Sequence, residues 1–258
     1  MGTSRRGRPR GAGVFLAGLL VTGLLWALTA LRQPTADLRA LEAKALTLQP
    51  PSEAGVFREP ELVDLRRLDA GFRFDIRYAT ARNFLGVPVY SRPGAYLQRP
   101  AAAALVAAQR ELERRGLGLL IFDAYRPWYV TWIFWQATPP HLREFVADPA
   151  GGSRHNRGCA VDLTLYDLRS GEPLPMPTDY DDFSPAAHID YPGGDPVARA
   201  NRDLLRSVME GVGFEPYPPE WWHYDFREWR SYPILNLRFE ELEQSGALPP
   251  GEARVDDP

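Results

Sequence analysis

Apolar residues recur with the period of a helix in four parts of the chain. The spacing predicts helices over residues 35–48, 100–115, 128–136 and 198–211. A proline opens the second of these segments and glycines follow it, as is usual at the two ends of a helix. The pattern therefore predicts several separate helices of ordinary length.

Other segments have the pattern of strands. Residues 72–78 alternate apolar and polar side chains, which predicts a half-buried strand. Residues 119–122 are continuously apolar and residues 163–166 are largely so, which predicts buried strands, while a short strand is expected at 87–90 and another at 222–226. The 25 prolines and 22 glycines indicate many turns between these elements. Strands and helices together predict a fold of the α+β class.

The N-terminus has the pattern of an export or membrane segment. Residues 14–31 are 18 residues without a charge, and four arginines precede them. This length lies between the core of a signal peptide and a transmembrane helix. We expect residues 1–31 to be a signal anchor or a signal peptide, rather than a buried core helix. The rest of the chain would then be periplasmic or extracytoplasmic, and anchored to the membrane or secreted.

The composition of residues 32–258 predicts three parts. We predict a linker over residues 32–56, one domain over residues 57–245 and a disordered tail over residues 246–258. A domain of this size can bury a full core. The net charge of −3 offers no basic surface for nucleic acid. The single cysteine, Cys159, excludes an internal disulfide.

Residues 153–166 combine a histidine and an aspartate in a turn followed by a strand. His155 precedes Gly158, and Asp162 opens the apolar run at 163–166. In one interpretation the two side chains form half of a metal site. In the other, the imidazole bonds a carbonyl group and the carboxylate caps a loop.

Two more candidate ligands lie in the sequence Glu-Trp-Trp-His, where Glu220 and His223 follow an aromatic-rich stretch. Alone, this pair is equally consistent with solvated groups at the edge of a core. Together the two stretches supply two imidazoles and a carboxylate, with Glu220 to spare. Three protein ligands and an open position are the usual layout of a catalytic Zn²⁺ site. The spare carboxylate can act as general base. The other histidines, His141 and His188, lie in loops and are expected at the surface.

Arg126 follows a predicted buried strand in the sequence Asp-Ala-Tyr-Arg-Pro. A guanidinium at the end of a strand can stabilise an oxyanion above a site. It can equally form a salt bridge with Asp123. Both interpretations stay open from the sequence.

Four motifs in order resemble those of one family. They are Phe-Asp-Ile-Arg-Tyr-Ala-Thr-Ala-Arg-Asn-Phe-Leu-Gly at 74–86, Asp-Ala-Tyr-Arg-Pro at 123–127, Ser-x-His-x-x-Gly-x-Ala-x-Asp-Leu-Thr-Leu at 153–165 and Glu-Trp-Trp-His at 220–223. In these motifs the chain resembles the VanX-type D-alanyl-D-alanine dipeptidases, which are zinc enzymes of the hedgehog/D,D-peptidase fold group. The resemblance implies a central antiparallel sheet flanked by helices.

The resemblance also implies roles for single residues. One Zn²⁺ per chain would be bound by His155, Asp162 and His223, with Glu220 as general base and Arg126 as stabiliser of the oxyanion. The small dipeptide substrate, D-Ala-D-Ala, would be bound by three residues of the motifs, Tyr78, Asp123 and Ser153. The acidic residue Asp181, in the segment 176–183, would also bind it.

Two positions depart from the family pattern. Two other functions also stay open. Arg154 stands beside a predicted metal ligand where a small residue is common, and Pro177 stands where glycine is common. Both can reshape the pocket. One alternative is a D,D-carboxypeptidase or endopeptidase that acts on peptidoglycan stem peptides. The other is a non-catalytic, metal-stabilised binding module of the cell envelope. The segment 78–86 favours the dipeptidase, and the spare Glu220 favours an enzyme.

Overall fold

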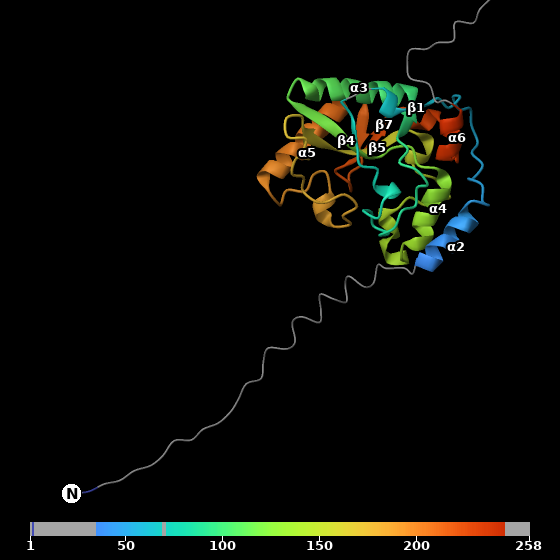
Figure 1. Ribbon diagram of the computed structural model, residues 1–258, viewed down its shortest axis with the longest axis horizontal. Coiled ribbons are helices and arrows are strands. Elements are labelled where there is room, and N and C mark those ends of the chain that lie inside the picture. Colours follow the sequence, from blue (N-terminus) through green and yellow to red (C-terminus); the bar gives the residue numbers. More distant parts are fainter. Residues whose placement is uncertain (1, 3–34, 69–70, 246–258) are drawn as a thin grey trace, which may run out of the picture. The chain divides into compact units, whose positions relative to one another are not determined.

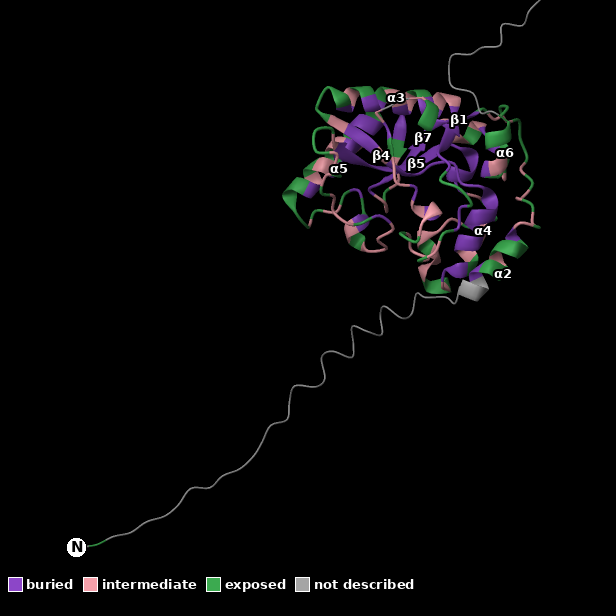
Figure 2. Ribbon diagram, in the orientation of Figure 1, coloured by how far each residue is buried: buried purple, intermediate pink, exposed green. Residues whose placement is uncertain are grey.

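Strand β5 (Ala160–Asp167) lies at the centre of a five-stranded sheet and positions the other elements (Figure 1). The computed structural model describes residue 2 and residues 35–68 and 71–245. Seven consecutive residues of β5, from Ala160 to Tyr166, are buried. Such burial requires cover on both faces of the strand, and Figure 2 shows the sheet as the buried interior of the domain.

The strands follow the order β2-β4-β5-β7-β6. Their bounds are β2 Arg73–Phe74, β4 Leu117–Asp123, β6 Phe214–Pro216 and β7 His223–Phe226. Strands β4, β5, β7 and β6 pair antiparallel, as the resemblance implies. The edge strand β2 pairs parallel with β4, so the expectation of a wholly antiparallel sheet is wrong at this edge.

Two predicted strands are shorter than expected or absent. The predicted strand 72–78 ends after Phe74, and Arg77–Ala79 form a 3₁₀ turn. The carbonyl of Tyr78 accepts the backbone N–H groups of both Val89 and Tyr90, at 2.9 Å each. These bonds hold 87–90 as a loop rather than a strand, and Pro88 has no N–H to offer a ladder. The alternation of 72–78 still predicts burial correctly, because Phe72, Ile76 and Tyr78 are buried.

The four predicted helices are confirmed. They are α2 (Thr35–Ala45), α3 (Arg99–Glu113), α4 (Trp128–Ala137) and α5 (Pro196–Gly211). Helix α3 packs on β4 and α5, while α5 also packs on β5 and β6. In Figure 1, α3 runs above the sheet, and α4 lies below it with α2 alongside.

Smaller elements complete the domain. Strands β1 (Leu62–Asp64) and β3 (Tyr96–Gln98), which the sequence pattern does not predict, form a separate antiparallel pair. A short C-terminal helix, α6 (Phe239–Gln244), buries its first residue fully. Helix α2 lies within the segment predicted as a linker, and it packs against α4. The predicted export segment 1–31 and the predicted tail 246–258 lie outside the described residues, so export and membrane anchoring stay predictions. Within the described ranges, none of the helices combines the length and the apolar character needed to cross a bilayer.

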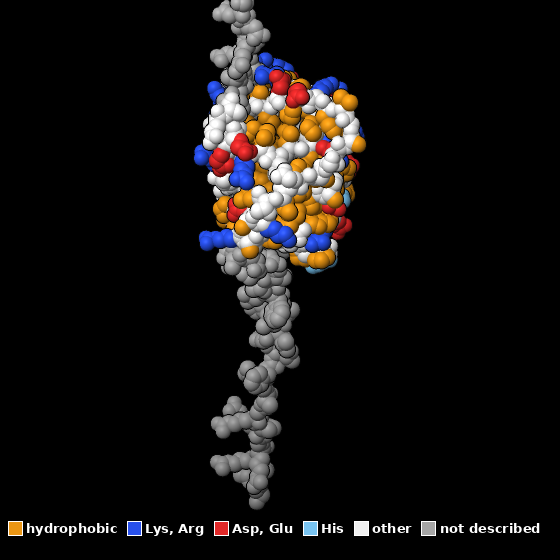
Figure 3. Space-filling model, turned by 90° about the vertical axis from the view of Figure 1, so that its right-hand side faces the viewer, with side chains coloured by type: hydrophobic (Ala, Val, Ile, Leu, Met, Phe, Trp, Pro, Cys, Tyr) orange, Lys and Arg blue, Asp and Glu red, His pale blue; other side chains and the backbone are white. Residues whose placement is uncertain are grey.

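The surface carries both signs of charge close together. On the face shown in Figure 3, blue and red side chains lie beside one another rather than in separate fields. Arg92, for example, pairs with Glu240 and with Glu243 of α6. Exposed pairs of this kind add little stability.

Gly158 joins the turn that carries His155 to strand β5. It has a positive φ of 66°, which a residue with a Cβ adopts at a cost. A Cβ at this position would lie 2.4 Å from Leu62 Cδ2 and 3.4 Å from the backbone nitrogen of Gln98. The glycine therefore allows both the turn and the close approach of the small sheet.

We predict that Gly158→Ala lowers the free energy of unfolding by about 2–4 kcal/mol, which combines left-handed backbone strain with overpacking against Leu62. Gly116→Ala is the matched control, because Gly116 has a φ of 73° and a Cβ added there would meet nothing within 4 Å. It should cost only about 1 kcal/mol. Urea denaturation of both variants measures the difference, and equal losses would show that the approach of Leu62 is not tight.

Candidate metal centre

Three predicted metal ligands meet where β5 and β7 pair. Asp162 of β5 lies opposite His223 of β7 in the antiparallel register. His155 comes from the 3₁₀ turn His155–Arg157, just before β5. One carboxylate oxygen and one nitrogen of each imidazole lie within 4.8 Å of one another, and all three residues are buried. The pairing of two strands thus brings together residues that are 68 positions apart.

The three donor atoms face a common point. Asp162 Oδ1 lies 3.3 Å from His155 Nε2 and 3.0 Å from His223 Nδ1. The two imidazole nitrogens are 3.1 Å apart. This convergence of three electron-pair donors is the arrangement that a cation stabilises.

The outer partners of the two imidazoles select which nitrogens face inward. His155 Nδ1 lies 2.6 Å from the carbonyl oxygen of Ala124, which can only accept a hydrogen bond. His223 Nε2 lies 2.9 Å from the carboxylate of Asp225. Each of these nitrogens is therefore the N–H donor, and the lone pairs of His155 Nε2 and His223 Nδ1 are left for a metal.

The two carboxylate oxygens of Asp162 have different surroundings. Its Oδ2 accepts the hydroxyl of Tyr180 at 2.8 Å, while Oδ1 is buried and accepts no hydrogen bond. Burial raises the pKa of Asp162, and positive charge on the imidazoles of His155 and His223 lowers it well below its usual range. A metal cation between the neutral imidazoles would supply the same positive charge. A buried, charged oxygen without a donor fits a metal ligand. Two nitrogens and one carboxylate oxygen, with a fourth position open, suit Zn²⁺.

Glu220 lies beside this centre without occupying it. Its Oε2 is 3.7 Å from His223 Nδ1, and its side chain is 19% exposed. Burial raises its pKa to about 8, against the attraction of His223. A divalent cation at the centre would favour the ionised form instead. Glu220 is placed where a carboxylate can exchange a proton with a molecule at the open position.

Arg126 both forms a salt bridge and faces the pocket, so the two interpretations of this residue coexist. Its Nε and Nη2 donate to Asp123 Oδ2 at 3.1 and 2.7 Å. The guanidinium carbon lies 5.1 Å from the ring centre of Tyr78 and 4.8 Å from that of Phe134. A guanidinium held on three sides keeps a fixed direction.

Asp123, expected to bind substrate, lies behind Arg126. It is fully buried, and its Oδ1 accepts from Tyr90 Oη at 2.7 Å and from the backbone N–H of Ala124 at 2.9 Å. It does not line the pocket formed by the described residues. Its contacts indicate that it orients Arg126.

Asp181 and Tyr78 meet at one end of the pocket. Tyr78 Oη donates to Asp181 Oδ1 at 2.9 Å, and the backbone N–H of Phe84 donates to Oδ2 at 3.3 Å. Burial raises the pKa of Asp181 to about 7, although the Tyr78 hydroxyl acts in the opposite direction. Asp181 also has a φ of 61°, which is uncommon for a residue other than glycine. Such strain at a polar residue is typical of functional sites.

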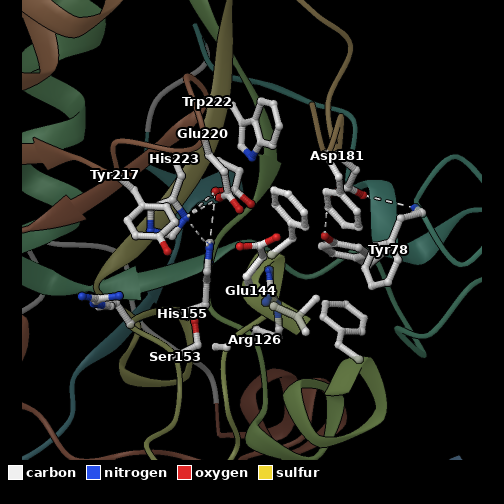
Figure 4. A pocket seen from close by; sticks show the side chains of 18 residues that line it. Tyr78, Arg126, Glu144, Ser153, His155, Asp181, Tyr217, Glu220, Trp222 and His223 are labelled. Atoms are coloured by element: carbon white, nitrogen blue, oxygen red, sulfur yellow. Dashed lines mark hydrogen bonds and ion pairs between the residues drawn. The ribbon is translucent and has the colours of Figure 1, made fainter. Parts of the chain in front are cut away.

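These groups line one small cavity of about 120 Å³. Pockets for drug-sized ligands measure roughly 300–1,000 Å³. Ser153 lies in the wall, where its hydroxyl accepts the backbone N–H of His155 at 3.2 Å. Figure 4 shows Asp181 and Tyr217 on opposite sides of the group formed by His155, Glu220 and His223. The cavity therefore suits a small ligand that extends from Asp181 past the metal centre toward Tyr217.

The structure adds residues that the sequence reasoning missed. Asp225 follows His223 by two positions in β7, so the period of a strand indicates that both point to one side. Tyr180 reaches Asp162 from a loop, and Glu144 lines the pocket. No local pattern marks these two. His141 and His188 are exposed, as predicted.

Comparison with known proteins gives one consistent result. A family model described as D-ala-D-ala dipeptidase, for the peptidase family M15, matches residues 58–241. A D-alanyl-D-alanine dipeptidase of Escherichia coli (strain K12) is 37% identical over 69% of this chain and 91% of its own length. Those of Streptomyces coelicolor and Enterococcus faecium are also 37% identical, over 62% and 61% of this chain and 89% and 87% of their own lengths.

We predict that Asp225→Ala weakens Zn²⁺ binding by roughly 10- to 100-fold, because His223 loses the acceptor that fixes its ring and its tautomer. Competition with a chromophoric chelator measures the affinity. Asp190→Ala is the control, since Asp190 is an exposed carboxylate paired with Arg206. Equal affinities in the two variants would exclude a role of Asp225 at the metal centre.

Proposed function

Because the chain belongs to the D-Ala-D-Ala dipeptidase family of metallopeptidases, we propose that it hydrolyses D-alanyl-D-alanine with one Zn²⁺ bound by His155, Asp162 and His223. The observation that carries this proposal is the convergence of three buried donor atoms beside Glu220 and Arg126 in a small cavity. The buried Asp162 Oδ1, which accepts no hydrogen bond, supports a cation there.

The proposed chemistry is peptide hydrolysis by a water molecule. A bound Zn²⁺ would polarise the scissile carbonyl group and lower the pKa of a water at its open position. Glu220 accepts the proton of the attacking water and then delivers it to the leaving amine. Arg126, held by Asp123, stabilises the negative charge that develops on the carbonyl oxygen.

Asp181 would bind the free ammonium group of the dipeptide. Its carboxylate lies at one end of the cavity, beside Tyr78 and with Phe84 and Phe183 in the wall. A peptide with an acylated N-terminus lacks the ammonium and needs more space at this end. This feature favours the dipeptidase over a D,D-carboxypeptidase or endopeptidase that acts on stem peptides. The half-buried Glu220, with no evident structural role, favours an enzyme over a binding module.

We predict that Glu220→Gln lowers kcat for D-Ala-D-Ala by roughly 10²- to 10⁴-fold, because the amide cannot accept the proton of the attacking water. Zn²⁺ content should stay the same. Release of D-Ala measures the rate, and Glu215→Gln, at an exposed position outside the pocket, is the control. Undiminished hydrolysis by Glu220→Gln would rule out Glu220 as the general base.

We predict that KM for D-Ala-D-Ala falls as pH rises through about 7. The Asp181 carboxyl, with its pKa raised to about 7, is neutral below this pH and ionised above it. Only the ionised form attracts the ammonium group of the substrate, which itself loses its proton above about pH 8. Initial rates between pH 6 and pH 8 measure this dependence.

Asp181→Asn should remove this pH dependence and raise KM at pH 8 by roughly 10- to 100-fold. The variant should also lose the preference for D-Ala-D-Ala over N-acetyl-D-Ala-D-Ala. Asp179→Asn is the control, since Asp179 is exposed and does not line the cavity. A wild-type enzyme that prefers the acetylated peptide would support a D,D-carboxypeptidase instead.

A further inference from the structure

Arg154 places a second guanidinium at the wall of the pocket. It precedes His155 in the chain and lines the same cavity, and its side chain is 41% exposed. Among the described residues, Arg126 and Arg154 are the two arginines that line this cavity. Arg126 is engaged by Asp123 and is assigned to the oxyanion, so the bonding of Arg154 decides whether the pocket offers a ligand a second cation.

Aromatic rings and one carboxylate hold the Arg154 side chain. Its guanidinium carbon lies 5.1 Å from the ring centre of Trp229 and 5.9 Å from that of Tyr217. Its Nε forms an ion pair with Asp225 Oδ2 at 3.5 Å but no hydrogen bond. Stacking on aromatic rings restrains a guanidinium without using its N–H groups.

The guanidinium of Arg154 therefore has N–H groups that can donate to a ligand. Its Nε is buried without a hydrogen-bond acceptor, and within the described ranges the ion pair with Asp225 is the one polar contact of its guanidinium. Polar groups that are buried in this way normally have a partner. A carboxylate matches the fork of a guanidinium with two parallel hydrogen bonds.

The position of Arg154 relates it to one part of the substrate. Tyr217, against which Arg154 packs, lies across the metal centre from Asp181 in Figure 4. If Asp181 binds the ammonium end, the residue on the carboxyl side of the scissile bond extends toward Tyr217 and Arg154. That residue departs as the free amino acid and is called the leaving residue below.

We propose that Arg154 is a specificity-determining residue that binds a carboxylate of the leaving residue. The inference rests on the proposed dipeptidase function. The carboxylate has two possible sources, which are the α-carboxylate of any leaving residue and the side chain of an acidic one. In either case Arg154 selects for a negative charge at this end of the pocket.

The test compares Arg154→Gln with wild-type enzyme and with Arg230→Gln. Arg230 is exposed, stacks on the same Trp229 ring at 4.2 Å and does not line the pocket, so its substitution makes the same change of charge nearby. The substrates are D-Ala-D-Ala, its C-terminal amide, D-Ala-D-Glu and D-Ala-D-Gln. For each pair we compare kcat and KM, and we measure Zn²⁺ affinity in all three proteins.

Recognition of the α-carboxylate predicts that wild-type enzyme prefers D-Ala-D-Ala to the amide, and that Arg154→Gln raises KM for D-Ala-D-Ala by roughly 10- to 100-fold with kcat little changed. Recognition of a side chain predicts that a similar loss is confined to D-Ala-D-Glu. In both cases Arg154→Lys retains part of the preference, since it keeps the charge without the fork.

Two results would overturn the proposal. One is that Arg154→Gln matches Arg230→Gln on every substrate. The other is that Arg154→Gln lowers kcat by the same factor for every substrate and also weakens Zn²⁺ binding. That result would make Arg154 a positioning residue that acts through Asp225. If wild-type enzyme hydrolyses none of the dipeptides, the proposed function itself fails, and that result is distinct from both.

Discussion

A buried carboxylate at the centre of a sheet is the constraint on which the site depends. Asp162 is 2% exposed and lies between β4 and β7, where an uncompensated charge is costly. One oxygen is satisfied by Tyr180, and the other faces the imidazoles of His155 and His223. The turn before β5 and the neighbouring strand β7 place two imidazoles against this carboxylate, and a cation held by the three groups would neutralise its charge.

A second layer of contacts fixes the direction of each functional group. Asp123 orients Arg126, Asp225 orients His223, and the carbonyl of Ala124 orients His155. These partners lie on or directly after strands of the sheet, so they are as rigid as the ligands they support. The pocket also has a polarity, with a carboxylate at the Asp181 end and the stacked guanidinium of Arg154 at the other. A small zwitterion with its ammonium group at one end and its carboxylate at the other matches this order of charges.

Helices and strands that follow from the apolar spacing of a single segment could be predicted well. Features that depend on contacts with other segments could not. The helices at 100–115 and 198–211 follow from their apolar spacing, because each buries one face. The predicted strand at 72–78 ends early because the carbonyl of Tyr78 bonds the loop at 87–90, which the alternation of 72–78 does not reveal. The parallel pairing of β2 and the small sheet of β1 and β3 depend on partners that no local period identifies.

The amino-acid sequence alone specifies the fold class, the main helices and strands, and the residues whose chemistry suits a metal and a general base. The motifs specify residue types, and residue types set ligand chemistry. Which of these groups meet follows from the tertiary structure, because contacts across a sheet depend on register. The tertiary structure places Asp123 behind Arg126, brings Tyr180 and Asp225 to the centre, and leaves the guanidinium of Arg154 without a hydrogen-bonding partner at the wall of the pocket.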